Sequence, residues 1–261
     1  MNLHDYWNGL TVVGLIASLG AGVVRGFAGF GFSALTVAGI SLFMASGAVV
    51  PAVLVLEILA SMSVWRSAAR DLDRAWLKSL VIGNALLVPV GVYMLANLDP
   101  VLLRLVVGSA LLFTASGLRW RSGLALHISP GMLATTGALS GFLNGLAASG
   151  GVVAALLMTA CHVRALAMRG TLITYVSLAS AYSLVWAGIF SQGGGGIDVF
   201  SAQTVRWILV LAPGMLLGMR LGRKAFARSN PEGFRLLVLN LLIGISALSV
   251  ARALFDLLAT R

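Results

Sequence analysis

Long apolar runs, separated by short polar or glycine-rich breaks, make up most of the chain. A helix needs about 20 apolar residues to cross the hydrocarbon core of a bilayer. Several of the runs approach or exceed that length, which predicts an all-α integral membrane protein, a polytopic bundle of about eight transmembrane segments. The runs lie at about 10–24, 31–46, 49–65, 76–96, 101–118, 131–143, 146–160, 170–190, 205–219 and 234–257.

The composition excludes most soluble folds. Apolar residues make up 59% of the chain and charged residues only 10%, whereas a soluble domain carries about 25% charged residues. The net charge of +10 would suggest nucleic acid in a soluble protein. Here the basic residues lie between apolar segments, with no aromatic-interleaved patch, so membrane topology explains them and no nucleic-acid partner is expected. The N-terminus lacks a basic region, so no cleavable signal peptide is expected.

Two pairs of apolar runs have unusual lengths. The pairs 10–24/31–46 and 131–143/146–160 are each too long for one span and rather short for two. Small residues interrupt both pairs, at 26–32 in the first and at 141–145 and 149–151 in the second. We interpret each pair as a broken helix or a re-entrant hairpin.

The chain repeats itself. Two sequence halves, 1–125 and 126–261, are therefore expected as homologous repeats of one membrane domain. A shift of 131 places Trp76 on Trp207, Gly83 on Gly214, Gly91 on Gly222, Pro100 on Pro231 and Arg104 on Arg235, and a shift of 115 places Gly22, Gly26 and Phe27 on Gly137, Gly141 and Phe142.

Matching loops of the two halves carry opposite charge bias. The region 66–78 holds four basic residues, whereas its counterpart 191–204 holds none. The loop 96–100 holds none, whereas its counterpart 220–228 holds four. The positive-inside rule places such loops on opposite faces, which predicts two inverted-topology repeats with the N-terminus outside.

The ends of the apolar segments carry their own signals. Asp73, Asp99-Pro100 and Ser129-Pro130 are expected helix starts, because each offers a capping side chain or a first-turn proline. Tryptophans also gather at segment ends, where we expect them in the interfacial belts of the membrane. They are Trp65, Trp76, Trp120 and Trp207.

Enzyme signatures do not support a catalytic role. The histidines are His4, His127 and His162, too scattered for a helical zinc pair. The sequence has no Gly-x-Ser-x-Gly elbow and no phosphate loop. The adjacent Cys161 and His162 would diverge on a helix, and a single cysteine allows no internal disulfide. We expect no enzyme activity, no metal and no cofactor.

The broken segments offer an anion site instead. A helix start exposes unpaired N–H groups and the positive end of the helix dipole, and two inverted broken helices can bring such starts together near the midplane. The alternative is that the glycines only pack helices, as expected at 214–222 and in part at 137–145. The candidate substrate-binding residues are Arg25, Gly26, Gly29, Gly31, Ser33, Gly141, Asn144, Ser149 and Gly150.

Two charged residues lie inside apolar segments. Arg25 lies deep in the first pair, where an arginine costs at least about 2.5 kcal/mol on insertion scales. It either contacts a substrate anion, pairs with Glu57, or extends to the interface as a snorkelling side chain. Glu57 lies in the middle of 49–65. It either carries a proton, because desolvation disfavours its charged form, or acts as a structural counter-ion.

Taken together, these motifs resemble the TauE/SafE sulfite exporter family. The likeness runs from about 9 to 257 and rests on the two glycine-phenylalanine motifs at 26–31 and 141–142, the basic loop after the second long helix, and Arg169-Gly170-Thr171. Phe32-Ser33 stands where many members have further glycines. The resemblance implies a multi-pass protein of the inner membrane that moves sulfite, sulfonates or related small anions.

The function expected is secondary transport of a small, sulfur-containing anion such as sulfite or an organosulfonate, coupled to a proton or ion gradient. A passive anion channel would use the same glycine motifs and leave Glu57 without a coupling role. A non-transporting membrane scaffold would show no flux. The partners expected are the lipid bilayer, the small anion and at most further copies of the chain.

Overall fold

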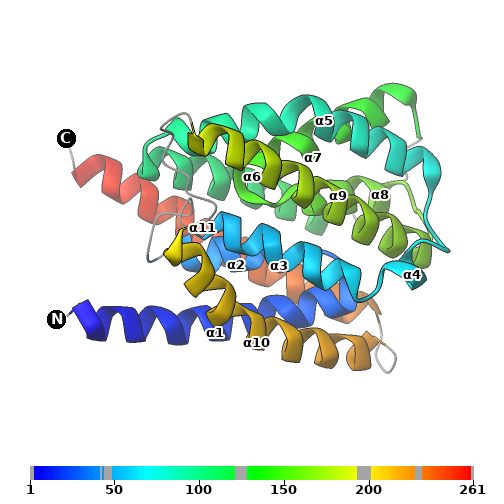
Figure 1. Ribbon diagram of the computed structural model, residues 1–261. Coiled ribbons are helices and arrows are strands. Elements are labelled where there is room, and N and C mark those ends of the chain that lie inside the picture. The colour runs from blue at the N-terminus through cyan, green and yellow to red at the C-terminus, as the bar shows by residue number, and fades with distance from the viewer. Residues whose placement is uncertain are drawn as a thin grey trace.

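The computed structural model describes residues 3–41, 43, 49–120, 128–192, 201–226 and 231–259. Over these ranges the chain forms helices and no strand, arranged as a bundle of long, roughly aligned rods (Figure 1). The helices are α1 Leu3–Ala28, α2 Phe32–Ser41, α3 Val50–Met62, α4 Trp65–Ala68, α5 Arg74–Asn97, α6 Pro100–Trp120, α7 Pro130–Ala147, α8 Gly150–Ala160, α9 Ala165–Gln192, α10 Ala202–Phe226 and α11 Pro231–Ala259.

Helix starts follow the expected capping residues. The Asp73 carboxylate accepts hydrogen bonds from the backbone N–H groups of Ala75 and Trp76 at the start of α5. The Ser129 hydroxyl accepts one from Met132 N–H at the start of α7, where Pro130 occupies the first turn. These side chains supply partners for N–H groups that the helix itself leaves unpaired.

Two helix pairs pack backbone to backbone through glycines. On α1, a Cβ at Gly22 would lie 2.6 Å from Met215 O and 3.2 Å from Gly218 Cα on α10. On α5, Gly83 faces Gly137 and Gly91 faces Gly145, both on α7. Residue numbers rise together along both contacts, so α1 runs parallel to α10 and α5 runs parallel to α7. The glycine packing expected at 214–222 and 137–145 is confirmed.

The two parallel pairs run in opposite directions. At the C-terminal end of α1, the Gly26 carbonyl accepts a hydrogen bond from Arg169 Nη2 at 3.1 Å, near the start of α9. Two residues further on, Thr171 Oγ1 accepts one from Asp73 N–H at 2.8 Å, at the start of α5. The end of the bundle where α1 finishes is therefore the end where α5 and α9 begin, as Figure 1 shows.

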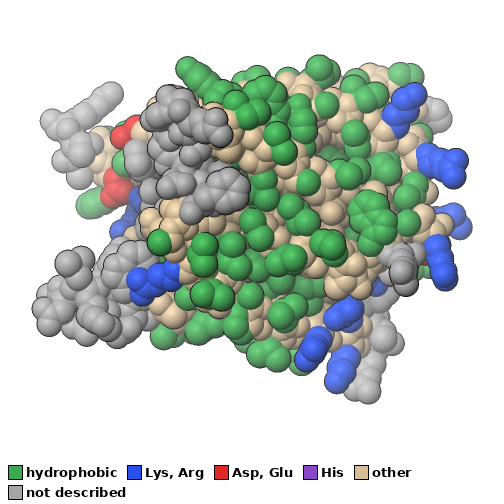
Figure 2. Space-filling view, in the orientation of Figure 1, with side chains coloured by type: hydrophobic (Ala, Val, Ile, Leu, Met, Phe, Trp, Pro, Cys, Tyr) green, Lys and Arg blue, Asp and Glu red, His purple; other side chains and the backbone are tan. Residues whose placement is uncertain are grey.

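Basic and acidic side chains gather at opposite ends of the visible face of the molecule. In Figure 2 most of the visible Lys and Arg side chains lie at the end where α5 and α9 start and α10 finishes, and the visible acidic side chains lie at the other end. Hydrophobic side chains cover the flank between them. Among the described residues, four helical stretches are long and apolar enough to cross a membrane: Gly9–Ala28, Arg74–Asn97, Ala165–Phe190 and Ala202–Ala225.

The structure corrects two expected lengths. The apolar run 49–65, which approaches the length of a span, holds a shorter helix, because α3 ends at Met62 after 13 residues. At 1.5 Å per residue it reaches only about 20 Å, less than the hydrocarbon core. In the first broken pair, α1 is a full-length helix of 26 residues and only α2, with 10 residues, is short.

The tryptophan expectation is wrong for two residues. Trp76 and Trp207 are only 1% and 2% exposed. The Trp207 ring packs over Gly14 of α1, with a ring carbon 3.0 Å from the position of a Cβ there. Trp65 and Trp120 are exposed, as belt residues should be.

Candidate functional site

The break between α1 and α2 is made by two glycines in the left-handed region. Gly29 has φ +83° and Gly31 has φ +93°, a backbone conformation that other residues rarely adopt. Gly29 N–H donates to Arg25 O at 2.9 Å, which completes the last turn of α1. The chain then turns and begins α2 at Phe32. The break lies inside the glycine-rich stretch where the sequence predicts it.

Arg25 is buried at this break. Its side chain is 2% exposed, so it does not snorkel to an interface. Nη1 donates to Gly29 O at 2.6 Å, and Nη2 donates to Ser61 Oγ at 2.6 Å. Nη2 also lies 3.0 Å from Glu57 Oε2. The guanidinium thus holds the turn after α1 against α3.

The Glu57 carboxylate joins Arg25 to the start of α2. Glu57 is 0% exposed. Its Oε2 pairs with Arg25, and its Oε1 accepts a hydrogen bond from the backbone N–H of Ser33 at 3.2 Å. Ser33 is the second residue of α2, where helical N–H groups lack an intrahelical partner. The Glu57 side chain therefore lies at the positive end of the α2 dipole.

The second break lies between α7 and α8. Helix α7 ends at Ala147, Ala148 adopts φ +52°, and α8 begins at Gly150. The N-cap residue Ser149 makes no side-chain cap, because its hydroxyl donates to Leu143 O at 3.2 Å. The start of α8 is thus buried and, unlike that of α2, carries no capping carboxylate.

Neutral polar groups surround the start of α8. Ser140 Oγ donates to Gly150 O at 2.5 Å, and Asn144 Nδ2 donates to Ser183 Oγ at 3.0 Å. The other amide atom, Asn144 Oδ1, is buried without a hydrogen-bond partner. The fully buried Tyr175 hydroxyl lies 2.8 Å from where a Cβ on Gly150 would be. The second break thus has hydroxyls and an amide where the first break has the ion pair between Arg25 and Glu57.

The predicted repeat aligns the two breaks. The shift of 115 places Arg25 on Ser140. The starts of α2 and α8, Phe32 and Gly150, are 118 apart, and the same shift places Glu57 on Tyr175. Sequence reasoning missed Ser140, although the predicted shift of 115 pairs it with Arg25. It missed Tyr175 because the shift of 118 is known only from the helix starts in the structure. It also missed Ser61, for which the sequence offers no pattern.

The breaks meet inside the bundle. A Cβ on Gly151, the second residue of α8, would lie 3.5 Å from Phe30 Cβ in the turn before α2. Two of the predicted site residues face other helices: Gly26 packs on Met219 of α10, and Gly141 on Asn84 of α5. The remaining predicted residues gather at the two breaks, and all of the predicted set, Glu57 included, is buried: Arg25, Gly26, Gly29, Gly31, Ser33, Glu57, Gly141, Asn144, Ser149 and Gly150.

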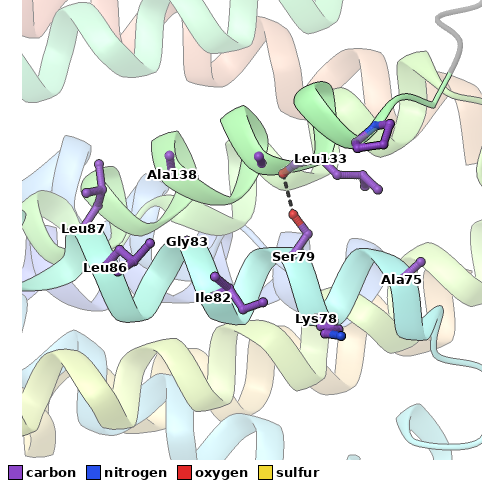
Figure 3. A pocket seen from close by; sticks show the side chains of 11 residues that line it. Ala75, Lys78, Ser79, Ile82, Gly83, Leu86, Leu87, Leu133 and Ala138 are labelled. Carbon is purple, nitrogen blue, oxygen red and sulfur yellow. Dashed lines mark hydrogen bonds between the residues drawn. The ribbon is translucent and has the colours of Figure 1, made fainter.

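A separate groove of about 450 Å³ lies between α5 and α7 (Figure 3). Its walls are mainly apolar, with Lys78 and Ser79 near one end, and Ser79 Oγ donates to Leu133 O at 2.6 Å. None of the predicted site residues lines it. Within the described ranges, no three His, Cys, Asp or Glu side chains are grouped so that they would hold a metal ion.

The apolar flank, the candidate spans and the buried polar breaks define a multi-pass helical membrane protein. A family model described as Sulfite exporter TauE/SafE matches residues 14–249, and the chain belongs to that family of membrane transporters. No curated protein and no solved structure matches the chain. The resemblance noted in the glycine motifs is thereby confirmed.

Proposed function

We propose that this protein is a secondary transporter of small oxyanions, with sulfite or an organosulfonate as substrate, coupled to a proton or ion gradient. One observation carries the proposal: a buried arginine, Arg25, lies at the buried N-terminus of a half-length helix, α2. Fixed positive charge and free helix N–H groups are what an oxyanion needs away from water. Membership of a sulfite exporter family supports this substrate class.

The proposed substrate site spans both helix breaks. On the first side it comprises Arg25, Ser33 and the turn glycines Gly29 and Gly31. On the second side the α8 start at Gly150, with Asn144 and Ser149, supplies neutral hydrogen-bonding groups. The contact between Gly151 and Phe30 supports a shared site, because it places the two helix starts next to one another. Gly26 and Gly141 would act by letting the neighbouring helices approach.

We further propose that the halves 1–125 and 126–261 are inverted-topology repeats with about eight membrane segments. The packing supports this, because α1 pairs with α10 as α7 pairs with α5, and corresponding helices run in opposite directions. The positive-inside rule then directs the basic end towards the cytoplasm. We propose the inner membrane as the location, because the resemblance to the sulfite exporter family implies it. The loop 193–200, on which part of the charge argument rests, lies outside the described residues.

Burial of the whole proposed site supports an alternating-access mechanism. Every proposed substrate contact is buried, so we propose that the site opens when one repeat moves against the other. A permanently open channel would expose these groups to water. The interlocked pairs α1–α10 and α5–α7 would move as units, since glycine contacts hold their backbones together.

Proteoliposomes test the proposed function directly. Vesicles holding the purified protein should accumulate sulfite or methanesulfonate above the external concentration when a pH or ion gradient is imposed. A passive channel would only equilibrate the anion, and a scaffold protein would give no flux above protein-free vesicles. Vesicles in which the gradient is collapsed by an ionophore provide the control, because they should reach equal concentrations on both sides.

A further inference from the structure

We propose that the Glu57 carboxylate is an internal anion that occupies the substrate position at the start of α2, so that each anion bound there requires one proton on Glu57. This inference rests on the proposed function, because it assigns the ion that is coupled at the same site. It goes further by stating the stoichiometry and the sign of the coupling.

The contacts of Glu57 carry the argument. The two groups expected to hold a substrate oxyanion at α2 are the Arg25 guanidinium and the Ser33 N–H. Glu57 engages both, with Oε2 3.0 Å from Arg25 Nη2 and Oε1 3.2 Å from Ser33 N. A carboxylate and an oxyanion have similar hydrogen-bonding requirements. In this structure the protein's own carboxylate therefore takes the place of the ligand.

Substrate and ionised Glu57 exclude each other at this position. Two negative charges at one helix start would repel strongly, because the site is buried and poorly screened. Protonation removes the charge of Glu57 and weakens its hold on Arg25, which frees the guanidinium and the α2 N–H for the substrate. The balance is Glu57–COO⁻ plus H⁺ plus anion giving Glu57–COOH with the anion bound, with the proton drawn from water.

The surroundings of Glu57 favour a bound anion. Arg25 faces it from α1. The neighbouring helices α9 and α10 contribute Arg169 and Arg223, and Arg169 feels the positive charges of both Arg25 and Arg223. Tyr175 is the buried titratable group of α9 nearest the second break, and α2 carries no titratable side chain over Phe32–Ser41. With Glu57 neutral, these arginines leave a net positive charge that a substrate anion offsets.

Calorimetry of anion binding to the purified protein measures how many protons are taken up with each bound anion. Binding of sulfite, or of methanesulfonate if that binds more tightly, is measured in two buffers that differ in ionisation enthalpy. We expect wild type to take up about one more proton per bound anion than Glu57→Gln, a difference that cancels any titration of the anion itself. Reciprocal linkage also predicts that the wild-type Kd falls by up to about tenfold per unit decrease in pH, whereas Glu57→Gln binds tightly with little pH dependence. Ser61→Ala is the matched control, because it removes another partner of Arg25 without changing charge and should keep the proton uptake.

The outcomes separate this inference from the proposed function. Absence of anion binding by folded wild-type protein would be a failure of the proposed function itself. Anion binding with equal proton uptake in wild type and Glu57→Gln would overturn the inference and leave the transporter intact. Infrared difference spectra of the wild type provide a second test, which needs no variant protein. Anion addition should produce a protonated-carboxyl band, and anion binding without that band also overturns the inference.

Discussion

Gly22 on α1 and Gly218 on α10 lie so close that a methyl group on Gly22 would come within 3.2 Å of Gly218 Cα and 2.6 Å of Met215 O. Both neighbours are backbone atoms, which a side-chain rotation cannot move away. The contact therefore depends on glycine, and it ties the first helix of the chain to the tenth.

Gly22→Ala should destabilise the protein by about 1–3 kcal/mol, the usual effect of overpacking a close contact. Gly20 is the matched control, because it lies two residues away on the same helix and a Cβ there would meet nothing within 4 Å. Gly20→Ala should be neutral or stabilise by up to about 1 kcal/mol, since alanine favours helix. The melting temperatures of both variants in detergent measure these effects. Equal effects of the two variants would contradict the packing role of Gly22.

Arg25→Ala should abolish anion binding and destabilise the protein by about 3–5 kcal/mol, because it leaves Glu57 buried and unpaired. Arg25→Lys should recover binding only in part, since a point charge replaces a planar fork. The double variant Arg25→Ala/Glu57→Gln should regain stability without regaining binding. The control is Arg104→Ala, which breaks the more exposed pair with Asp256 at 2.7 Å and should leave binding intact. Normal binding by folded Arg25→Ala would remove Arg25 from the site.

Glu57→Gln should retain anion exchange between equal concentrations but lose accumulation driven by a pH gradient. Glutamine keeps the size of the side chain and can still accept a hydrogen bond from Ser33 N–H, whereas it cannot titrate. Counterflow and gradient-driven uptake in the same proteoliposomes measure the two activities. Normal gradient-driven accumulation by this variant would exclude Glu57 as the coupling residue.

Tyr175→Phe should weaken anion binding about three- to tenfold, which corresponds to loss of one hydrogen bond of about 1 kcal/mol. The change removes only a hydroxyl, which is fully buried beside Gly150, so the melting temperature should change little. Tyr182→Phe provides the comparison, because its hydroxyl donates to Ala85 O on α5 at 3.0 Å, away from the breaks. Equal Kd values for Tyr175→Phe and wild type would assign Tyr175 to packing alone.

Cysteine labelling should find Lys224 and Arg70 on one face of the membrane and Asp99 and Gln203 on the other. The expectation follows from the directions of α5 and α10, which place their basic ends together. Single cysteines at these positions, in a Cys161→Ser background, can be tested in intact cells with an impermeant reagent. Labelling of Lys224 and Gln203 variants from the same side would contradict opposed orientations of the repeats.

The sequence predicted the apolar helices and the first break because both depend on local signals. Hydropathy located α5. Gly29 and Gly31 marked the break, because both adopt a left-handed backbone conformation that other residues rarely adopt. Hydropathy could not place the end of α3, because Val64 and Trp65 continue the apolar run past the turn. It also could not place Trp76 or Trp207, whose burial depends on helices distant in sequence.

The sequence likewise predicted some residues of the candidate site and not others. A charge inside an apolar segment signals itself, so the amino-acid sequence alone was enough to single out Arg25 and Glu57 and to suggest their pairing. Nothing in the sequence distinguishes Ser61 from other helical serines. Its role is seen only in the structure, where its hydroxyl accepts a hydrogen bond from Arg25. Hydroxyl residues are common on apolar helices, so Ser140 gains interest only through the shift of 115. Tyr175 gains interest only when the helix starts in the structure are aligned.

The pairing of α1 with α10 has a consequence for synthesis. The ribosome makes the small-residue face of α1 first, yet the helix that covers it begins only at Ala202. At about 5–20 residues per second, α1 waits roughly ten to thirty-five seconds for its partner. Throughout that interval its glycine face must rest against lipid, the translocon or a chaperone, so a nascent chain stalled before α10 would be an early target for quality-control proteolysis.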